Sequence, residues 1–151
     1  MLFRSNYEVP SIEAMHDLGQ KLGNQFKAGD LILISGPLGA GKTALTQGIG
    51  KSLGIEEVTS PTFVISRIHE GKVRLVHVDA YRLQGQSTAL FDDLDLESYL
   101  PTSVTVVEWG EGLADRFSSE YLEIKISYGD AENDRNVTLL PHGARWQGFE
   151  V

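Results

Sequence analysis

Apolar and polar positions along this chain recur with two different periods, and these periods predict helices and strands. Between Ser11 and Phe26 the apolar residues lie three or four positions apart, which places them on one face of an amphipathic helix. Ser11, which follows Pro10, suits the N-cap because its hydroxyl can accept a hydrogen bond from the first turn. Glu13 lies in that first turn, where its negative charge is favourable beside the positive end of the helix dipole. The apolar positions of this face are Ile12, Met15, Leu18, Leu22 and Phe26.

The next apolar run, Leu31 to Ile34, has no polar position and is typical of a strand that is covered on both faces. It therefore predicts a sheet with helices on both sides. After a glycine-rich turn, apolar residues recur every fourth position from Lys42 to Leu53, and Gly54 suits the C′ position that ends a helix. The chain thus predicts a strand, a tight loop and a helix in succession.

The rest of the chain predicts further strands and one short helix, so the fold class is α/β. Because two pairs of strands are joined by short polar turns, each pair should form an antiparallel hairpin beside a parallel core. We expect a mixed sheet flanked by helices, and the stretch from His142 onward shows no clear pattern. The expected elements are a hairpin of strands 63–68 and 73–78, an acidic helix over 89–100, a buried strand over 104–107, and a hairpin of strands 122–127 and 136–140.

Composition limits what such a protein can do. A chain of 151 residues with 41% apolar side chains suits a single domain over residues 1–151. Its net charge of −8 offers no broad basic surface for nucleic acid, so any role on RNA should be indirect. The absence of cysteine excludes disulfides and thiolate metal sites. No stretch resembles a signal peptide or a membrane span, so we expect a cytoplasmic protein without membrane contact.

The glycine-rich turn carries the strongest chemical signal. Residues 36–43 match G-x-x-x-x-G-K-[ST] at every fixed position, between a predicted strand and a predicted helix. Such a loop turns backbone N–H groups towards phosphate oxygens, Lys42 bridges the β- and γ-phosphates, and Thr43 offers its hydroxyl to Mg²⁺. A plain turn with a solvated Lys42 is disfavoured, because a cation at a helix N-terminus needs an anionic partner. ATP is favoured over GTP because no N-K-x-D sequence occurs.

A phosphate-binding loop of this kind, here residues 36–43, is called a P-loop. It needs an acidic residue from a neighbouring strand, and two are available. Glu108 and Asp79 each end a predicted strand, although a helix cap or a surface salt bridge is the alternative for both. His77 shares a strand face with Asp79, but no third metal ligand lies nearby in sequence. A hydroxyl in Ser60–Phe63 could sense the γ-phosphate, or the segment could be a plain turn. Tyr81 and Trp109 suit packing better than base stacking. Arg82 and Arg135 are the candidate cations for phosphate, and a solvated surface position is the alternative for both.

Four blocks in this order resemble the TsaE family, also called YjeE, of bacterial ATPases of tRNA threonylcarbamoyladenosine biosynthesis. The blocks are Leu38–Thr43, Ser60–Phe63, His77–Leu83 and Glu108–Trp109. The resemblance implies a small P-loop NTPase-like α/β fold. It also implies an ATPase that associates with the threonylcarbamoyl transferase subunit and its paralogous partner protein, and that meets tRNA only through this complex. The chain departs from the family pattern at Pro37, Ala80 and Gly110.

The same resemblance assigns roles to individual residues. It implies that Thr43 and Glu108 bind Mg²⁺, and that Asp79 and Thr62 are catalytic or sense the γ-phosphate, together with Lys42. Ser11 should lie near the adenine. The nucleotide-binding residues should be Gly36, Leu38, Gly39, Ala40, Gly41, Lys42, Thr43, Ala44 and Arg135, besides Ser11.

These observations favour an Mg²⁺-dependent ATPase in which Asp79 orients the attacking water. Hydrolysis by the isolated chain should be slow, because the sequence encodes no obvious arginine finger or lid. A small-metabolite kinase is one alternative, although the acidic stretch over 92–97 is followed by no arginine until Arg116, whereas a kinase lid needs several. A non-catalytic, ATP-dependent switch is the other. The acidic helix over 89–100 could dock a basic partner surface or simply face solvent.

Overall fold

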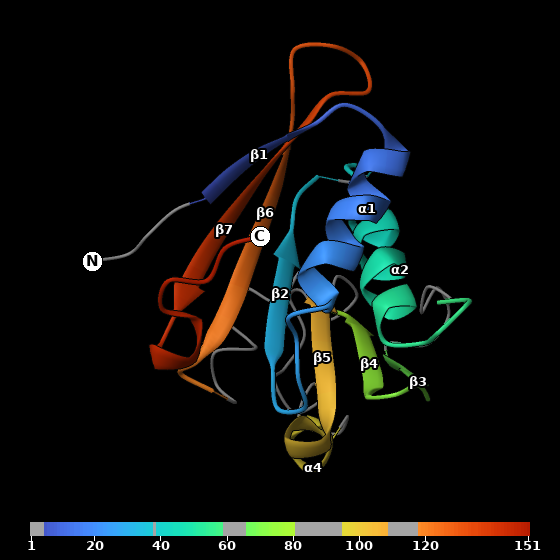
Figure 1. The fold of residues 1–151 in the computed structure, drawn as a ribbon, viewed down its shortest axis with the longest axis vertical. Helices are drawn as coiled ribbons and strands as arrows, with labels where there is room; N and C mark the ends of the chain where they lie inside the picture. Colours follow the sequence, from blue (N-terminus) through green and yellow to red (C-terminus); the bar gives the residue numbers. More distant parts are fainter. Residues whose placement is uncertain (1–4, 38, 59–65, 81–94, 109–117) are drawn as a thin grey trace.

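The computed structural model describes residues 5–37, 39–58, 66–80, 95–108 and 118–151. They form one seven-stranded sheet in the order β1-β7-β6-β2-β5-β4-β3, with two long helices packed side by side (Figure 1). The strands are β1 (Ser5–Val9), β2 (Leu31–Ser35), β3 (Ser66–His69), β4 (Arg74–Asp79), β5 (Ser103–Glu108), β6 (Tyr121–Tyr128) and β7 (Arg135–His142). The helices are α1 (Ile12–Gly23), α2 (Lys42–Ser52) and α4 (Leu96–Tyr99), with 3-10 turns at Leu100–Thr102 and Ala144–Trp146.

The centre of the sheet is parallel and its margins are antiparallel. Strand β2 lies between β5 and β6 and runs parallel to both, and β4 runs parallel to β5. Strand β3 pairs antiparallel with β4, as β7 does with β6 and β1 does with β7. The predicted mixed sheet, with a parallel core and two antiparallel hairpins, is therefore confirmed. The carboxyl ends of β2, β5 and β4 lie in register, with Ile34 beside Glu108 and Glu108 beside Asp79.

Two apolar layers cover the two faces of the sheet. Helices α1 and α2 pack on one face, where Leu22, Leu45 and Ile49 join the inward side chains of β2 and β5 in one core. The helices cross closely because glycines stand at the crossing, and a Cβ on Gly19 would lie 2.2 Å from the Leu45 carbonyl oxygen. On the other face, Leu96 of α4 packs into a second core with Leu33 and Val107. Helices therefore lie against both faces, as the apolar run of β2 predicts.

The structure corrects some of the predicted boundaries. Helix α1 ends at Gly23 rather than at Phe26, because Phe26 leaves the helix axis to pack edge-on against Trp146. That contact gives structure to the stretch after His142, in which Trp146 is fully buried. Strand β1 was not predicted at all. Of the acidic helix expected over 89–100, only residues from 95 onward are described, and there the helix is the four-residue α4.

Within the described ranges, no helix combines the length and the apolar character that crossing a membrane requires.

Candidate functional site

The P-loop joins the end of β2 to the start of α2, as its sequence predicts. Gly41 is the N-cap of α2 and has a φ of 109°, a left-handed conformation that favours glycine. Position 36 requires glycine for a different reason, because a Cβ there would lie 2.6 Å from the Ile126 carbonyl oxygen. The first N–H groups of α2 have no partner inside the helix, so they are available to an anion. The loop therefore has the local geometry of a phosphate cradle.

Lys42 lies within this loop rather than in solvent. Its side-chain Nζ donates to the carbonyl oxygens of Gly36 at 2.8 Å and Pro37 at 2.9 Å, and the residue is only 6% exposed. Thr46 fixes the first turn of α2 by donating its hydroxyl to the Lys42 carbonyl oxygen. Thr43, the next residue along α2, is exposed. The lysine and the threonine of the motif thus stand at the helix N-terminus, where the motif requires them.

The two predicted carboxylates meet at the same end of the sheet as the P-loop. Glu108 and Asp79 are neighbours in the β4–β5 ladder, and Glu108 also pairs with Ile34 of β2. Side chains alternate along a strand, and Ile34 and Val106 belong to the core under α1 and α2, so Glu108 faces the layer that contains α2. By the same alternation, Asp79 follows Leu75 and His77 on that face. The topology therefore brings both acids to the edge from which the P-loop departs.

Glu108 is not a surface residue but the partner of a buried histidine. Its Oε2 lies in hydrogen-bond contact with the Nε2 of His77, and His77 is completely buried. Glu108 itself is 5% exposed. A buried carboxylate needs such a partner, because leaving it unpaired costs several kcal/mol. The surface salt-bridge alternative for Glu108 is therefore wrong, and the residues that follow Glu108, on which a helix cap would depend, lie outside the described residues. His77, which shares a strand face with Asp79, directs its Nε2 to Glu108.

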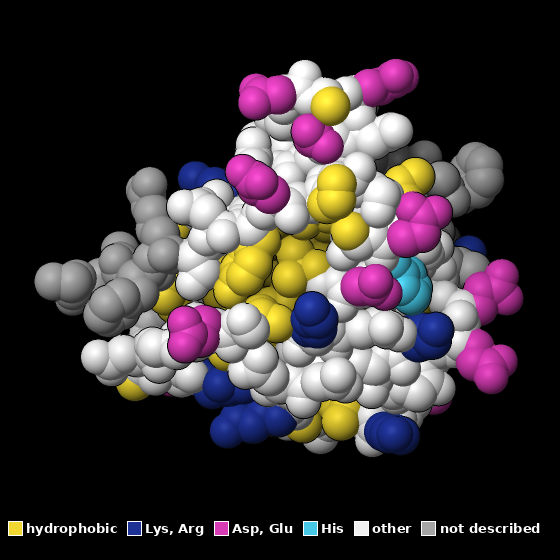
Figure 2. All heavy atoms as spheres, turned by 45° about the horizontal axis from the view of Figure 1, so that its top comes forward, with side chains coloured by type: hydrophobic (Ala, Val, Ile, Leu, Met, Phe, Trp, Pro, Cys, Tyr) yellow, Lys and Arg dark blue, Asp and Glu magenta, His cyan; other side chains and the backbone are white. Residues whose placement is uncertain are grey.

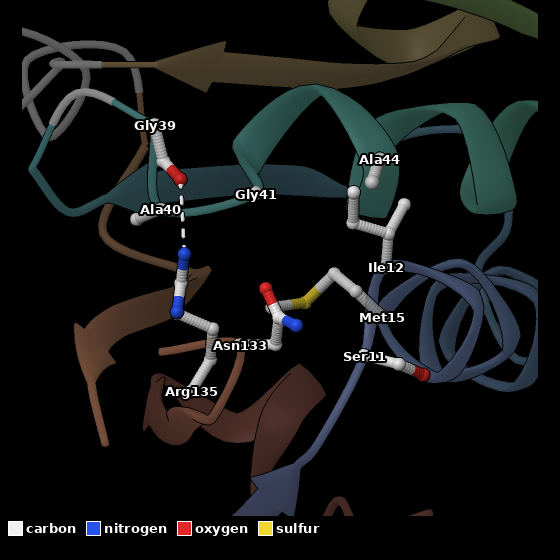
Figure 3. Close-up of a pocket in the computed structure, with 9 residues that line it drawn as sticks. All are labelled: Ser11, Ile12, Met15, Gly39, Ala40, Gly41, Ala44, Asn133 and Arg135. Carbon is white, nitrogen blue, oxygen red and sulfur yellow. Dashed lines mark hydrogen bonds between the residues drawn. The ribbon is translucent and has the colours of Figure 1, made fainter. Parts of the chain in front are cut away.

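A small pocket opens beside the P-loop, between α1 and the turn that joins β6 to β7 (Figure 3). Its volume is about 160 Å³, below the roughly 300 Å³ at which sites for whole drug-sized ligands begin. It can hold one flat ring system, with the rest of a ligand lying along the loop. The pocket is lined by Ser11, Ile12, Met15, Gly39, Ala40, Gly41, Ala44, Asn133 and Arg135.

Arg135 links the β6–β7 turn to the P-loop. One guanidinium nitrogen, Nη1, donates to the carbonyl oxygens of Glu132 and Asp134, and the other, Nη2, donates to that of Gly39 at 3.4 Å. The guanidinium also lies over the Tyr128 ring, 4.8 Å from its centre. Arg135 therefore lies beside the P-loop, at the end that contains Gly39.

Ser11 has a structural role at the pocket rim. Its hydroxyl oxygen accepts a hydrogen bond from the Ala14 backbone N–H at 3.0 Å, which confirms the predicted N-cap of α1. Ile12, the next residue, was expected on the buried helix face but is 72% exposed. It stands in the first turn of α1, beyond the edge of the sheet, and lines the pocket instead.

Sequence reasoning missed four residues around this pocket and its P-loop rim. The sequence pattern places Met15 and Ile12 at ordinary core positions of a helix, and it places Asn133 in a polar turn. Tyr128 has 54% of its surface exposed and packs under Arg135. Of these four residues, only Tyr128 could have been found from the sequence, because it is an aromatic residue directly after a predicted strand. Of the predicted site residues, Leu38 and Thr62 lie outside the described residues, as do Tyr81, Arg82 and Trp109.

The donor set at this edge fits Mg²⁺. The described residues contain no group of three or more His, Asp and Glu side chains that could hold a metal by themselves. Magnesium, however, is commonly held by one or two protein oxygens together with phosphate oxygens and water. Thr43 supplies an exposed hydroxyl, and Glu108 has one oxygen bound to His77 and a second that accepts no hydrogen bond within the described part of the chain. These are the oxygen ligands that such a shared site needs.

The surface around the pocket carries charges of both signs. Figure 2 shows apolar side chains in a hollow, with acidic side chains around it and Lys and Arg side chains at intervals. No continuous basic surface covers the described residues on this face, which agrees with the net charge of −8. This distribution suits a small ligand with few phosphates better than a long polyanion.

Comparisons with known proteins converge on one family. Residues 9–137 match the profile of the family described as threonylcarbamoyl adenosine biosynthesis protein TsaE. A tRNA threonylcarbamoyladenosine biosynthesis protein TsaE from Streptomyces coelicolor is 47% identical over 144 residues, covering 91% of this chain and 97% of that protein. Its counterpart from Mycobacterium tuberculosis H37Rv is 46% identical over 139 residues, covering 86% of this chain and 83% of that protein. The crystal structure of Bacillus subtilis YdiB superposes with a TM-score of 0.80 at 28% identity, covering 97% of this chain and 91% of that one.

Proposed function

Because this chain belongs to the TsaE family of threonylcarbamoyladenosine biosynthesis proteins, we propose that it is the ATP-binding and ATP-hydrolysing component of that pathway. The observation that carries the proposal is the meeting of the P-loop with Asp79 and Glu108 at one edge of the sheet. In P-loop proteins this combination binds a nucleoside triphosphate and its metal. In this proposal, residues 1–151 act as one domain.

The nucleotide lies along the loop with its base in the small pocket. The adenine packs between Met15 and Ala44, with Arg135 beside it, and Ser11 shapes the rim as the cap of α1. The phosphates accept hydrogen bonds from the backbone of Gly39 to Thr43. Lys42 exchanges the carbonyl oxygens of Gly36 and Pro37 for the β- and γ-phosphate oxygens, because an ammonium group binds an anionic oxygen more strongly than a neutral carbonyl oxygen.

Thr43 and Glu108 hold the magnesium ion in this proposal. When bound, Mg²⁺ neutralises the negative charge that builds up on the β- and γ-phosphates. Glu108 suits this task because its buried carboxylate already has a fixed partner in His77. Thr43 suits it because its exposed hydroxyl stands next to Lys42 on the first turn of α2.

Asp79 orients the water that attacks the γ-phosphate, and Thr62 senses that phosphate. Asp79 is half-buried at the end of β4, beside Glu108, so its carboxylate can reach a water that lies over the loop. The isolated chain hydrolyses ATP slowly. The contact of Arg135 with the Gly39 carbonyl oxygen supports this slow rate, because it holds the guanidinium on the Gly39 side of the loop rather than beside Asp79.

The partners are the threonylcarbamoyl transferase subunit and its paralogous partner protein, and tRNA is reached only through this complex. The net charge of −8 supports the indirect role, because direct binding to tRNA needs clustered Lys and Arg side chains. Binding to the transferase pair completes the site and raises the turnover rate.

The deciding experiment measures ATP turnover by the protein alone, with the transferase pair, and with the pair plus tRNA. We expect slow release of phosphate alone and a clear increase with the partners. Rapid turnover that the partners leave unchanged would contradict the proposal. Transfer of phosphate to an added small alcohol would identify a kinase instead. A Glu108→Gln variant that binds ATP and supports tRNA modification at full rate would identify a non-catalytic switch.

A further inference from the structure

We propose that His77 is a positioning residue, which holds the carboxylate of Glu108 in the orientation that binds the metal. The inference rests on the proposed function, because it assigns Glu108 to Mg²⁺. It adds a role for a residue that touches neither nucleotide nor metal. The observation that carries it is the buried contact between the Nε2 of His77 and the Oε2 of Glu108.

The imidazole of His77 is fixed by its surroundings. The residue has no exposed surface, and it lies in the interior of the sheet, with Arg67 of β3 on one side and Val106 of β5 on the other. A ring in that position cannot swing as a surface side chain does. The carboxylate that it contacts therefore has a rigid partner built into a strand.

The contact divides the two oxygens of Glu108 between two tasks. Oε2 accepts the Nε2–H of His77, while Oε1 accepts no hydrogen bond in the part of the chain that the structure describes. The side chain of Glu108 retains 7% of its surface. One oxygen is thus fixed by the protein and the other is left for a ligand. Partners that fix a metal-binding side chain in this way typically change metal affinity 10–100-fold when they are removed.

The other ring nitrogen argues against a purely structural role. Nδ1 of His77 is buried and has no hydrogen-bond partner in the described residues. A histidine that only fills space in the core lowers stability relative to an apolar side chain, because its buried, unpaired ring nitrogen loses its hydrogen bond to water. Among the described residues, the polar contact that favours a histidine at this position is the one that Nε2 makes with Glu108.

The test compares three variants in the full-length protein. His77→Leu removes the donor, whereas His77→Gln places an amide N–H near the former Nε2. Thr105→Val is the matched control, because Thr105 is also fully buried and lies on β5 but faces the opposite side of the sheet. Binding of a fluorescent ATP analogue is titrated with Mg²⁺, and its affinity is measured separately in EDTA.

We expect His77→Leu to raise the half-saturating Mg²⁺ concentration about 10–100-fold while the affinity in EDTA stays the same. His77→Gln should restore most of the loss, and Thr105→Val should leave the Mg²⁺ midpoint unchanged. If His77→Leu does not fold, His77→Asn replaces it, because its shorter amide stops short of Glu108. An unchanged Mg²⁺ midpoint in a folded variant overturns the inference.

A double-mutant cycle with Glu108→Ala separates this inference from the proposed function. If His77 acts through Glu108, His77→Leu has no further effect on the Mg²⁺ midpoint once Glu108 is alanine. Two effects that add independently would refute the positioning role while leaving Glu108 as a metal ligand. A Glu108→Ala variant with a normal Mg²⁺ midpoint would refute the proposed metal site itself, and the role of His77 with it.

Discussion

The P-loop and the carboxylates of Asp79 and Glu108 meet at one end of the sheet, but the chain specifies them in different ways. The loop is a run of consecutive residues whose shape follows from local glycines and the start of α2. The carboxylates belong to separate strands and become neighbours only through the β4–β5 register. The geometry of the P-loop can therefore be encoded locally, whereas the meeting of the two carboxylates depends on the whole sheet.

This difference predicts that the two regions fail differently when they are altered. Changes in the loop should weaken binding of the nucleotide. Changes at the carboxylates should slow hydrolysis while binding persists, because in the proposed function these groups act on the metal and the attacking water. Asp79→Asn, Lys42→Ala and Gly41→Ala test this division, and Ser11→Ala tests the helix cap at the rim of the pocket.

Asp79→Asn should have the largest effect. Losing the carboxylate that orients the water should lower the rate of ATP hydrolysis about 10²–10⁴-fold, with ATP affinity nearly unchanged. Phosphate release in the presence of the transferase pair, together with equilibrium binding, measures both quantities. Asp17→Asn, an exposed change on α1, is the control. A normal rate would remove Asp79 from the site.

Lys42→Ala should come next, and its effect should be on binding. It removes the charge-assisted contact to the phosphates, which should cost about 2–3 kcal/mol of ATP binding free energy. That corresponds to an affinity lower by about 30- to 150-fold. Calorimetric titration with ATP tests it, and Lys51→Ala, at the exposed far end of α2, should bind normally. Equal affinity of the two variants would show that Lys42 does not reach the phosphates.

Gly41→Ala should lower both stability and affinity. An alanine at φ 109° costs about 1–2 kcal/mol, and its Cβ would press on Met15 at 3.3 Å, in the pocket. Gly29→Ala is a matched control, because Gly29 also has a positive φ of 99° but has nothing within 4 Å. Both variants should unfold at lower denaturant concentration, and only Gly41→Ala should bind ATP more weakly. Weaker binding by both would show that strain anywhere disturbs the site.

Ser11→Ala should have the smallest effect. It removes the hydrogen bond to the Ala14 N–H, which should cost about 1 kcal/mol of unfolding free energy and lower the Tm by about 2–4 °C. Ser11→Asn keeps an oxygen in place and should melt close to the wild type. Thermal denaturation followed by circular dichroism makes the comparison. An unchanged Tm for the alanine variant would mean that the cap does not stabilise α1.

The amino-acid sequence predicts the loop and most elements, because their signals are local. The P-loop motif, the period of α2 and the apolar run of β2 each lie within a dozen residues. Strand β1 escaped prediction because it pairs with β7, which lies more than a hundred residues away along the chain. The burial of Trp146 escaped for the same reason, since its partner Phe26 belongs to the other end of the sequence.

The candidate site divides in the same way. Lys42 and Thr43 could be assigned from the motif, and Glu108 and Asp79 could be named as acids at strand ends. The contact of His77 with Glu108 could not be predicted, because it depends on β4 lying beside β5 in one particular register. The pocket residues Asn133 and Ile12 are brought together only by the β6–β7 turn and α1.

The most direct test of the central claim is a crystal structure of the protein with Mg²⁺ and a non-hydrolysable ATP analogue. We predict that the phosphates lie against the backbone of Gly39 to Thr43, with the Lys42 amine turned onto them and the metal between the Thr43 hydroxyl and Glu108. The account is contradicted if the triphosphate binds elsewhere, or if Lys42 still holds the carbonyl oxygens of Gly36 and Pro37 while the analogue is bound.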